Sequence, residues 1–136
     1  MNQTNIELAK YRMSKSKENL ESAKENYNDG RLGTSVNRSY YAVFHACRAV
    51  NALDGFDSKK HSGVISYFNK NFIKTGALSK DLSKIIRYVR RIREDEDYED
   101  FYYISDDDAM KQLNMAIEFV NCIETYLSKT IGDEEL

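Results

Sequence analysis

None of the 136 residues in this chain is a proline. Proline removes a backbone donor and clashes with the preceding turn, so it strongly interrupts an α-helix. Its absence leaves every part of the chain free to form helix. Hydrophobic residues make up 41% of the sequence, which is ordinary for a globular protein, and a chain of this length can bury a core. We therefore expect residues 1–136 to form one all-α domain.

The spacing of the apolar residues predicts four long helices and one short helix. In the first helix the bulky side chains of Ile6, Met13 and Leu20 recur every seven residues, which is the spacing of a bundle seam. The expected helices cover residues 5–28 and 34–53, a short stretch after 58 that ends near 75, a stretch that begins at 79, and a last one that begins at 105. Short connections between long helices favour an up-and-down bundle with its core in residues 5–128.

Polar residues predict where two of these helices begin. Thr4 with Glu7 has the form of a capping box, and Ser105 followed by three aspartates is typical of a helix start. The acidic segment 94–103 has no apolar stripe, so we expect a mostly extended loop there. We also expect the acidic tail, residues 130–136, to fray.

Cysteine usage and the lack of long apolar runs favour a cytoplasmic protein. Cys47 and Cys122 both fall within helical apolar patterns, so we expect them to be reduced core residues. No apolar run approaches the length of a membrane span, and the N-terminus has no secretory signal. The sequence has no metal-ligand spacing and no glycine-rich phosphate loop, so we expect no metal and no cofactor.

The second predicted helix carries the most informative polar stripe. Arg38 and His45 are seven positions apart, with Tyr41 between them and Arg48 beyond. An imidazole beside a fixed cation can move a proton during phosphodiester cleavage, while the guanidinium holds the phosphate. Tyr41 could position the substrate, and Arg48 and Asn37 could add phosphate contacts. The alternative is that Arg38 pairs with a carboxylate and that Tyr41 and His45 pack in an interface.

The fourth predicted helix is strongly basic, in a chain whose net charge is −2. Its arginines are candidates for phosphate binding because the guanidinium group is planar and bidentate. They are Arg87, Arg90, Arg91 and Arg93. The alternative is that they pair with the acidic residues that follow. The second histidine of the chain, His61, is interpreted as a capping or surface residue.

The stretch NRSYYAVFHACRAVNALDG, residues 37–55, closely resembles the second helix of small prokaryotic proteins of the HEPN family. The resemblance continues in KKHSGVISYFNKNFIKTGALS and RRIREDEDYEDF. It implies a helical bundle that usually dimerises. Many members are metal-independent ribonucleases that use an arginine followed, after four to six residues, by a histidine. Several are toxins neutralised by a minimal nucleotidyltransferase, and others serve as binding modules.

Arg38 and His45, with six residues between them, fit that family motif, although they lie in the second helix rather than the last long one. A later segment begins at Arg93 but has Tyr98 where the histidine would be. We predict a homodimer, because Tyr41, Phe44 and nearby alanines of the second helix are expected to be partly uncovered. The predicted function is RNA or nucleotide binding, with a ribonuclease toxin, a non-catalytic binding subunit and a helical interaction module as the readings that remain open.

Overall fold

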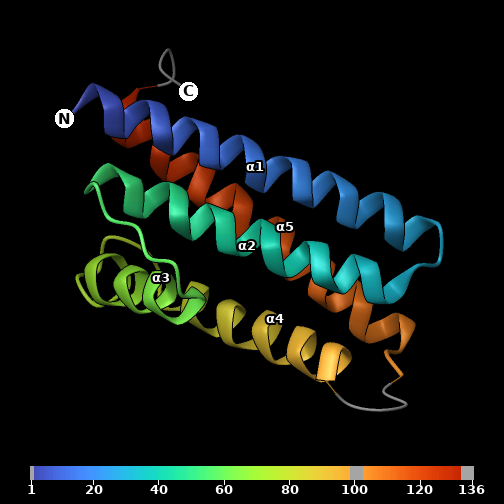
Figure 1. Cartoon of the computed structure of the whole chain (residues 1–136). Coiled ribbons are helices and arrows are strands. Elements are labelled where there is room, and N and C mark those ends of the chain that lie inside the picture. The colour runs from blue at the N-terminus through green and yellow to red at the C-terminus, as the bar shows by residue number, and fades with distance from the viewer. Residues whose placement is uncertain (1, 99–102, 133–136) are drawn as a thin grey trace.

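The computed structural model describes residues 2–98 and 103–132, which form helices and short connections without a strand. The elements are α1 (Gln3–Asn28), α2 (Leu32–Leu53), α3 (His61–Phe68), the π-helical turn η1 (Asn69–Ile73), α4 (Asp81–Tyr98) and α5 (Asp106–Ile131). The predicted all-α class, with four long helices and a short one, is confirmed (Figure 1). Within these residues, none of the helices combines the length and the apolar character that crossing a bilayer requires.

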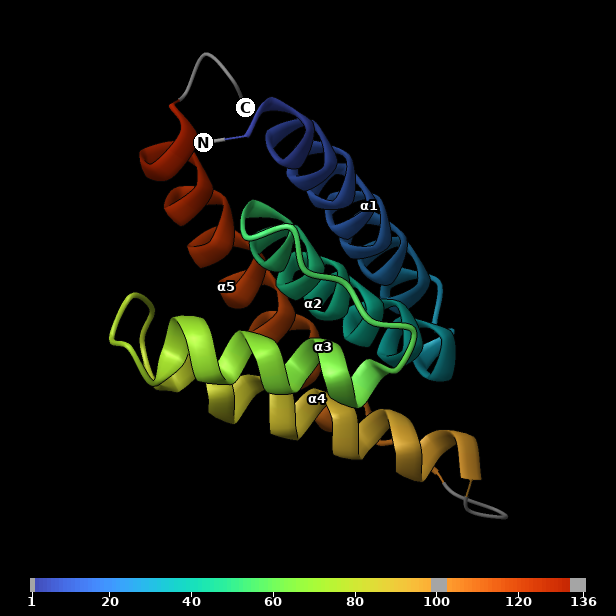
Figure 2. The same ribbon diagram turned by 60° about the vertical axis from the view of Figure 1, so that its left-hand side comes forward.

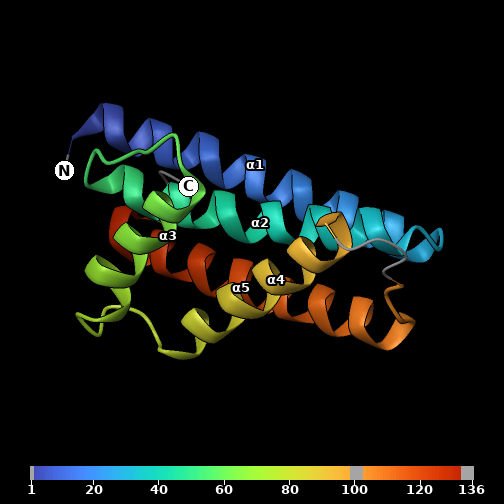
Figure 3. The same ribbon diagram turned by 60° about the horizontal axis from the view of Figure 1, so that its bottom comes forward.

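Helix α2 is the central element and packs against each of the other four α-helices. Figure 3 shows α1 running alongside α2, with α3, α4 and α5 below. Small residues let α1 approach closely: Ser16 donates a hydrogen bond to the backbone oxygen of Ala42 at 2.7 Å. Ser35 donates to the backbone oxygen of Ala23 at 2.8 Å. Helix α1 therefore covers one whole side of α2, and this sets which side remains open.

A buried amide fixes α5 against two other helices. The side chain of Gln112 is fully buried, and its Nε2 donates to the backbone oxygens of Val36 in α2 and Val89 in α4, at 3.0 Å and 3.5 Å. Around it the core is apolar and includes Met13, Phe68 and Phe119. Burying an amide is tolerable when its donors are paired. Gln112 thus links three helices through one side chain.

Several helix boundaries differ from the sequence expectation by a few residues, and two of the differences change an interpretation. The side chain that caps α1 is Asn2, which accepts a hydrogen bond from the backbone N–H of Asn5, so the predicted capping box at Thr4 is wrong. Helix α4 continues to Tyr98, so the first half of the predicted extended loop is wrong as well. Helix α5 continues to Ile131, so the tail predicted to fray from residue 130 is helical at its start. Residues 99–102 of the predicted loop and residues 133–136 of the tail lie outside the described residues. Ser105 caps α5 as predicted, accepting from the N–H of Asp108 at 3.0 Å.

Two burial predictions are also wrong. Cys47 is buried, but Cys122 is exposed on α5, because it lies beside the apolar stripe rather than within it. The alanines of α2 are fully covered by the chain itself, and Phe44 is only 6% exposed. Of the groups expected to leave an uncovered patch for a second copy, only Tyr41 is half-buried. The chain itself therefore covers most of the apolar surface on which the homodimer prediction was based.

Candidate functional site

One long side of α2 is not covered by another helix. In Figure 1, α1 lies on one flank of α2, α3 and α4 lie on the other, and α5 lies behind. Four half-buried side chains follow the open side: Arg38, Tyr41, His45 and Arg48. We call these four residues the α2 face. All four were predicted from the sequence as catalytic or phosphate-binding residues.

Arg38 is held in place by neutral groups. Its Nη1 donates to the amide oxygen of Asn19 in α1 at 3.0 Å, and its Nη2 donates to the amide oxygen of Asn37 at 2.6 Å. Its guanidinium lies over the ring of Tyr41, 5.3 Å from the centroid. Among the described residues Arg38 makes no ion pair, so the alternative in which it pairs with a carboxylate is not observed there. Asn37 therefore orients Arg38, and the positive charge remains uncompensated by these partners.

A second guanidinium reaches the same tyrosine from α4. The side chain of Arg93 lies over the rings of both Tyr40 and Tyr41, at 5.1 Å and 5.6 Å from their centroids. Tyr41 therefore has two arginines within cation–π distance, Arg38 from its own helix and Arg93 from another. Both guanidinium groups lie close to one aromatic ring, and guanidinium groups are good donors to phosphate oxygens. The geometry is suited to a phosphate group.

The basic stretch of α4 is not one patch. Arg87 and Arg91 are exposed, whereas Arg93 is half-buried against the α2 aromatic rings. Arg90 pairs with Glu94 one turn later, with 3.3 Å between Nε and the carboxylate. The helix periodicity divides the arginines between two directions, and only Arg93 contacts the tyrosines of α2. The alternative of internal pairing holds for Arg90.

His61, interpreted from the sequence as a capping or surface residue, is bound to the core instead. Its Nδ1 lies 3.0 Å from the hydroxyl of Tyr40, and its ring packs 4.1 Å from that of Phe44. Burial, followed by the charge of Arg93, lowers the pKa of His61, so the ring is neutral at neutral pH. Burial raises the pKa of Tyr40 to about 12, so its hydroxyl keeps its proton. We call Tyr40, Tyr41, Phe44, His61 and Arg93 the Tyr40 cluster.

His45 has a less favourable environment for proton transfer. Burial and the nearby charges of Arg48, Lys15 and Arg12 lower the pKa of His45 to about 4. Its Nδ1 is buried and has no hydrogen-bond partner among the described residues. A ring with this pKa is neutral at pH 7 and cannot act there as a general acid.

A cavity of about 300 Å³ lies between the α2 face and the Tyr40 cluster. It is bounded by the linker between α2 and α3, residues 54–60, which passes over α2 before α3 begins (Figure 2). Asp57 in this linker accepts a hydrogen bond from Arg48 and another from Arg12, both at 3.1 Å, so it fastens the linker to α1 and α2. The cavity is lined by Phe44, Arg48, Asp57, Ser58, Lys59 and His61.

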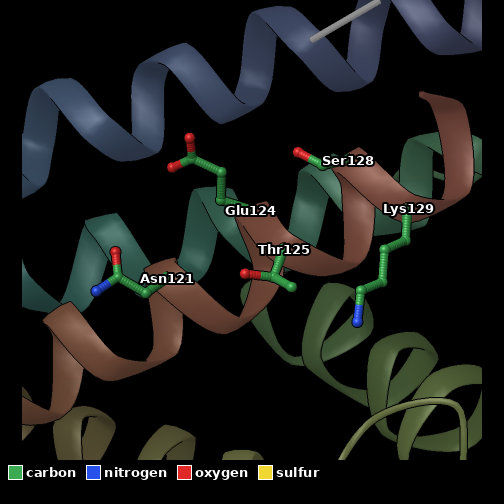
Figure 4. Close-up of a pocket in the computed structure, with 5 residues that line it drawn as sticks. All are labelled: Asn121, Glu124, Thr125, Ser128 and Lys129. Atoms are coloured by element: carbon green, nitrogen blue, oxygen red, sulfur yellow. The ribbon is translucent and has the colours of Figure 1, made fainter. Parts of the chain in front are cut away.

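A different cavity, of about 530 Å³, lies along α5 alone (Figure 4). One of its lining residues, Glu124, pairs with Lys17 of α1 at 2.7 Å, and Lys129 contributes a cation. It has no aromatic ring and offers a carboxylate, so it is a poor match for a nucleotide. No three His, Cys, Asp or Glu side chains of the described residues gather in a way that could hold a metal ion.

Sequence reasoning missed His61 and the role of Tyr40. The two residues are 21 positions apart in the sequence, in different helices, and only the path of the linker brings them together. A local signal was present in the pair Tyr40-Tyr41, since adjacent tyrosines on a helix must face different neighbours. Tyr40 is buried, and a buried tyrosine hydroxyl needs a hydrogen-bond partner.

Comparison with known proteins agrees with this architecture. A HEPN domain family model matches residues 9–126. A UPF0332 protein of Thermotoga maritima is 32% identical over 117 residues, covering 86% of this chain and 89% of the relative. A Methanocaldococcus jannaschii protein with the name "Putative toxin MJ0142" is 32% identical over 120 residues, covering 88% and 82%. A UPF0332 protein of Archaeoglobus fulgidus is 31% identical over 118 residues, covering 87% and 94%. The chain belongs to the HEPN family.

Proposed function

We propose that this HEPN protein binds RNA on the α2 face and the adjoining Tyr40 cluster. The observation that carries the proposal is the convergence of Arg38 and Arg93 on the ring of Tyr41. Guanidinium groups bind phosphate oxygens in bidentate fashion, and a tyrosine ring can stack on an unpaired base. The neighbouring cavity adds the exposed Lys59, together with Arg48, whose guanidinium is paired with Asp57.

The test is the salt dependence of RNA binding. Each phosphate contact on a single strand contributes about 0.7 to the slope of log affinity against log salt, so Arg38→Ala should flatten the slope by about that amount. The control is Lys129→Ala, which removes the same charge from the α5 cavity shown in Figure 4. Fluorescence anisotropy with a labelled single-stranded oligonucleotide measures both. An unchanged slope in Arg38→Ala would show that the α2 face does not bind RNA.

One observation favours cleavage of the bound RNA as a second candidate function. The contact with Tyr40 fixes the ring of His61, with Arg93 and the cationic cavity beside it. In the tautomer that carries its proton on Nδ1, His61 donates to the Tyr40 oxygen, and Nε2 can accept a proton. Nε2 of His61 would take the proton of a ribose 2′-hydroxyl while the 2′-oxygen forms a bond to phosphorus. The bond between phosphorus and the 5′-oxygen breaks, and the leaving 5′-oxygen takes a proton from water. The products are a 2′,3′-cyclic phosphate and a 5′-hydroxyl.

In this cleavage mechanism the general base is His61 rather than His45. Alanine variants of the two histidines distinguish between them. A positioned acid or base contributes about 10²–10⁴-fold to the rate, so His61→Ala should reduce cleavage by that factor. His45→Ala should leave most of it. Tyr40→Phe should reduce the cleavage rate less than His61→Ala does. The His61 ring stays packed against Phe44 in this variant but loses its hydrogen bond to the Tyr40 hydroxyl. If the wild type cuts no RNA, the protein is a binding subunit and the cleavage candidate is wrong.

The relative named as a toxin suggests the biological setting. We propose that the chain acts in a toxin–antitoxin pair, as a homodimer, with a minimal nucleotidyltransferase as the neutralising partner. Expression of this chain alone should then slow growth, and co-expression of a nucleotidyltransferase encoded beside it should restore growth. A non-catalytic binding subunit would give no growth defect, and sedimentation at the mass of a single chain would contradict the dimer.

A further inference from the structure

A third cavity, of about 750 Å³, lies on the outer side of α3 and η1, and the proposed function does not use it. Its volume is within the range of small-molecule sites. It is lined by Phe56, Gly63, Ser66, Tyr67, Asn69, Lys70 and Lys74. The lining therefore combines two aromatic rings, two cations and several small or polar groups.

The two rings form a fixed platform. Phe56 and Tyr67 stack with 3.9 Å between their centroids and an angle of 10° between their planes. The hydroxyl of Tyr67 donates to the carboxylate of Asp54 at 2.9 Å, which anchors the outer end of the ring. Both side chains are half-buried. A platform that is already ordered loses little conformational entropy when another flat group stacks on it.

The cations are available to an anion. Lys70 and Lys74 are exposed, and neither makes an ion pair with any residue that the structure describes. Gly63 lets the linker pack directly against α3, because a Cβ at this position would collide with the side chain of Ser58. The ligand chemistry that matches flat rings beside two lysines is a planar base joined to a phosphate.

We propose that this cavity binds a nucleoside phosphate, whose base extends the Phe56–Tyr67 stack and whose phosphate is bound by Lys70 and Lys74. The nucleotide is either free or one unit of a single-stranded RNA. The linker supports the second source, because Phe56 lines this cavity while the following residues, Asp57 to Lys59, line the cavity beside the α2 face. One strand that leaves the α2 face along this linker would reach the stack. Bases of a duplex are already paired and stacked, so duplex RNA does not fit.

Two probes distinguish the sources. The first is adenosine monophosphate, titrated while the NMR signals of Tyr67 and the two lysines are recorded. The second is a labelled single-stranded oligoadenylate, compared by fluorescence anisotropy with the same strand in a duplex. Loss of one stacked base weakens binding by at least about fivefold, which is the expected effect of Phe56→Leu on the single strand. Two lost lysine contacts, in Lys70→Gln with Lys74→Gln, should flatten the salt slope by about 1.4.

The matched control is Lys129→Gln, an exposed lysine of α5 in a cavity without rings. It should leave both probes unchanged, and duplex binding should be insensitive to all these variants. If Phe56→Leu unfolds the chain, the lysine variant decides, because both of its side chains are exposed.

The outcomes separate this site from the α2 face. If adenosine monophosphate shifts no Tyr67 signal and the lysine variant binds the single strand like the wild type, the site does not exist, whatever Arg38→Ala does. If the wild type binds no RNA but the mononucleotide still shifts Tyr67, the cavity is a free-nucleotide site and the proposed RNA binding is wrong. If the lysines serve only to complement the carboxyl end of the helix, their replacement lowers the melting temperature without changing either probe, and the proposal is overturned.

Discussion

His45 should make the protein less stable as the pH falls below neutrality, and this can be measured without any ligand. The folded structure lowers the pKa of this ring from 6.5 to about 4, because the ring is half-buried and lies near Arg48 and Lys15. The unfolded chain, in which His45 regains its ordinary pKa, therefore takes up a proton first as the pH falls. The stability is fully present above that ordinary pKa and is lost as the pH approaches the folded value.

The two pKa values set the magnitude. Each pKa unit of difference corresponds to about 1.4 kcal/mol, so proton uptake by His45 alone should lower the free energy of unfolding by about 2 kcal/mol between pH 7 and pH 5. The comparison is with His45→Gln, which keeps a polar side chain that does not titrate. All other titratable groups are present in both proteins, so the difference between the two profiles reports the loss of His45 and of its interaction with His61.

Urea denaturation followed by circular dichroism at pH 7, 6 and 5 gives the two profiles. The wild type should lose stability more steeply than His45→Gln, and the two should converge in slope above pH 7. Parallel profiles across this range would show that the ring titrates normally in the folded protein. In that case the argument against His45 as a general acid would also fall.

Two further predictions concern local features of the fold. Ser105→Ala should lower the free energy of unfolding by about 1 kcal/mol, because the backbone N–H of Asp108 loses its acceptor. Thermal melting measures the change, and a melting temperature equal to that of the wild type would contradict the capping role of Ser105. Cys122 should react with a thiol reagent in the folded protein, whereas Cys47, whose pKa is raised by burial, should react only after unfolding; two equivalents of fast reaction would contradict this.

Periodicity made the helices predictable, because each long helix buries one apolar stripe. The heptad spacing of Ile6, Met13 and Leu20 placed all three in the core, and the Ser105 start was read correctly from the residues that follow it. The same reasoning failed after Ile92, where no further apolar residue marks a buried side. The α4 ladder continues there regardless, assisted by the pairing of Arg90 with Glu94 four residues later.

The candidate site was predictable only along a single helix. The spacing of Arg38, Tyr41 and His45 correctly placed them on one side of α2, since that depends on local geometry alone. The contacts of His61 and Arg93 with Tyr40 depend on how α2, α3 and α4 pack together. No local pattern in a single sequence indicates contacts between residues so far apart in the chain. Thr4 was mistaken for the cap of α1 because Asn2 has an equally good capping side chain two residues earlier.

The amide of Gln112 has a consequence for how faithfully the helices dock. Apolar stripes repeat every turn, so a helix that slides along its axis by one turn, about 5.4 Å, can still bury much of its surface. In the observed alignment Gln112 donates to the backbones of Val36 and Val89 together. A displacement that separates the amide from both helices would leave a buried donor without a partner, at a cost of about 1–3 kcal/mol. Gln112 therefore stabilises the observed position of α5 relative to α2 and α4. The same packing places Arg93 of α4 over the tyrosines of α2.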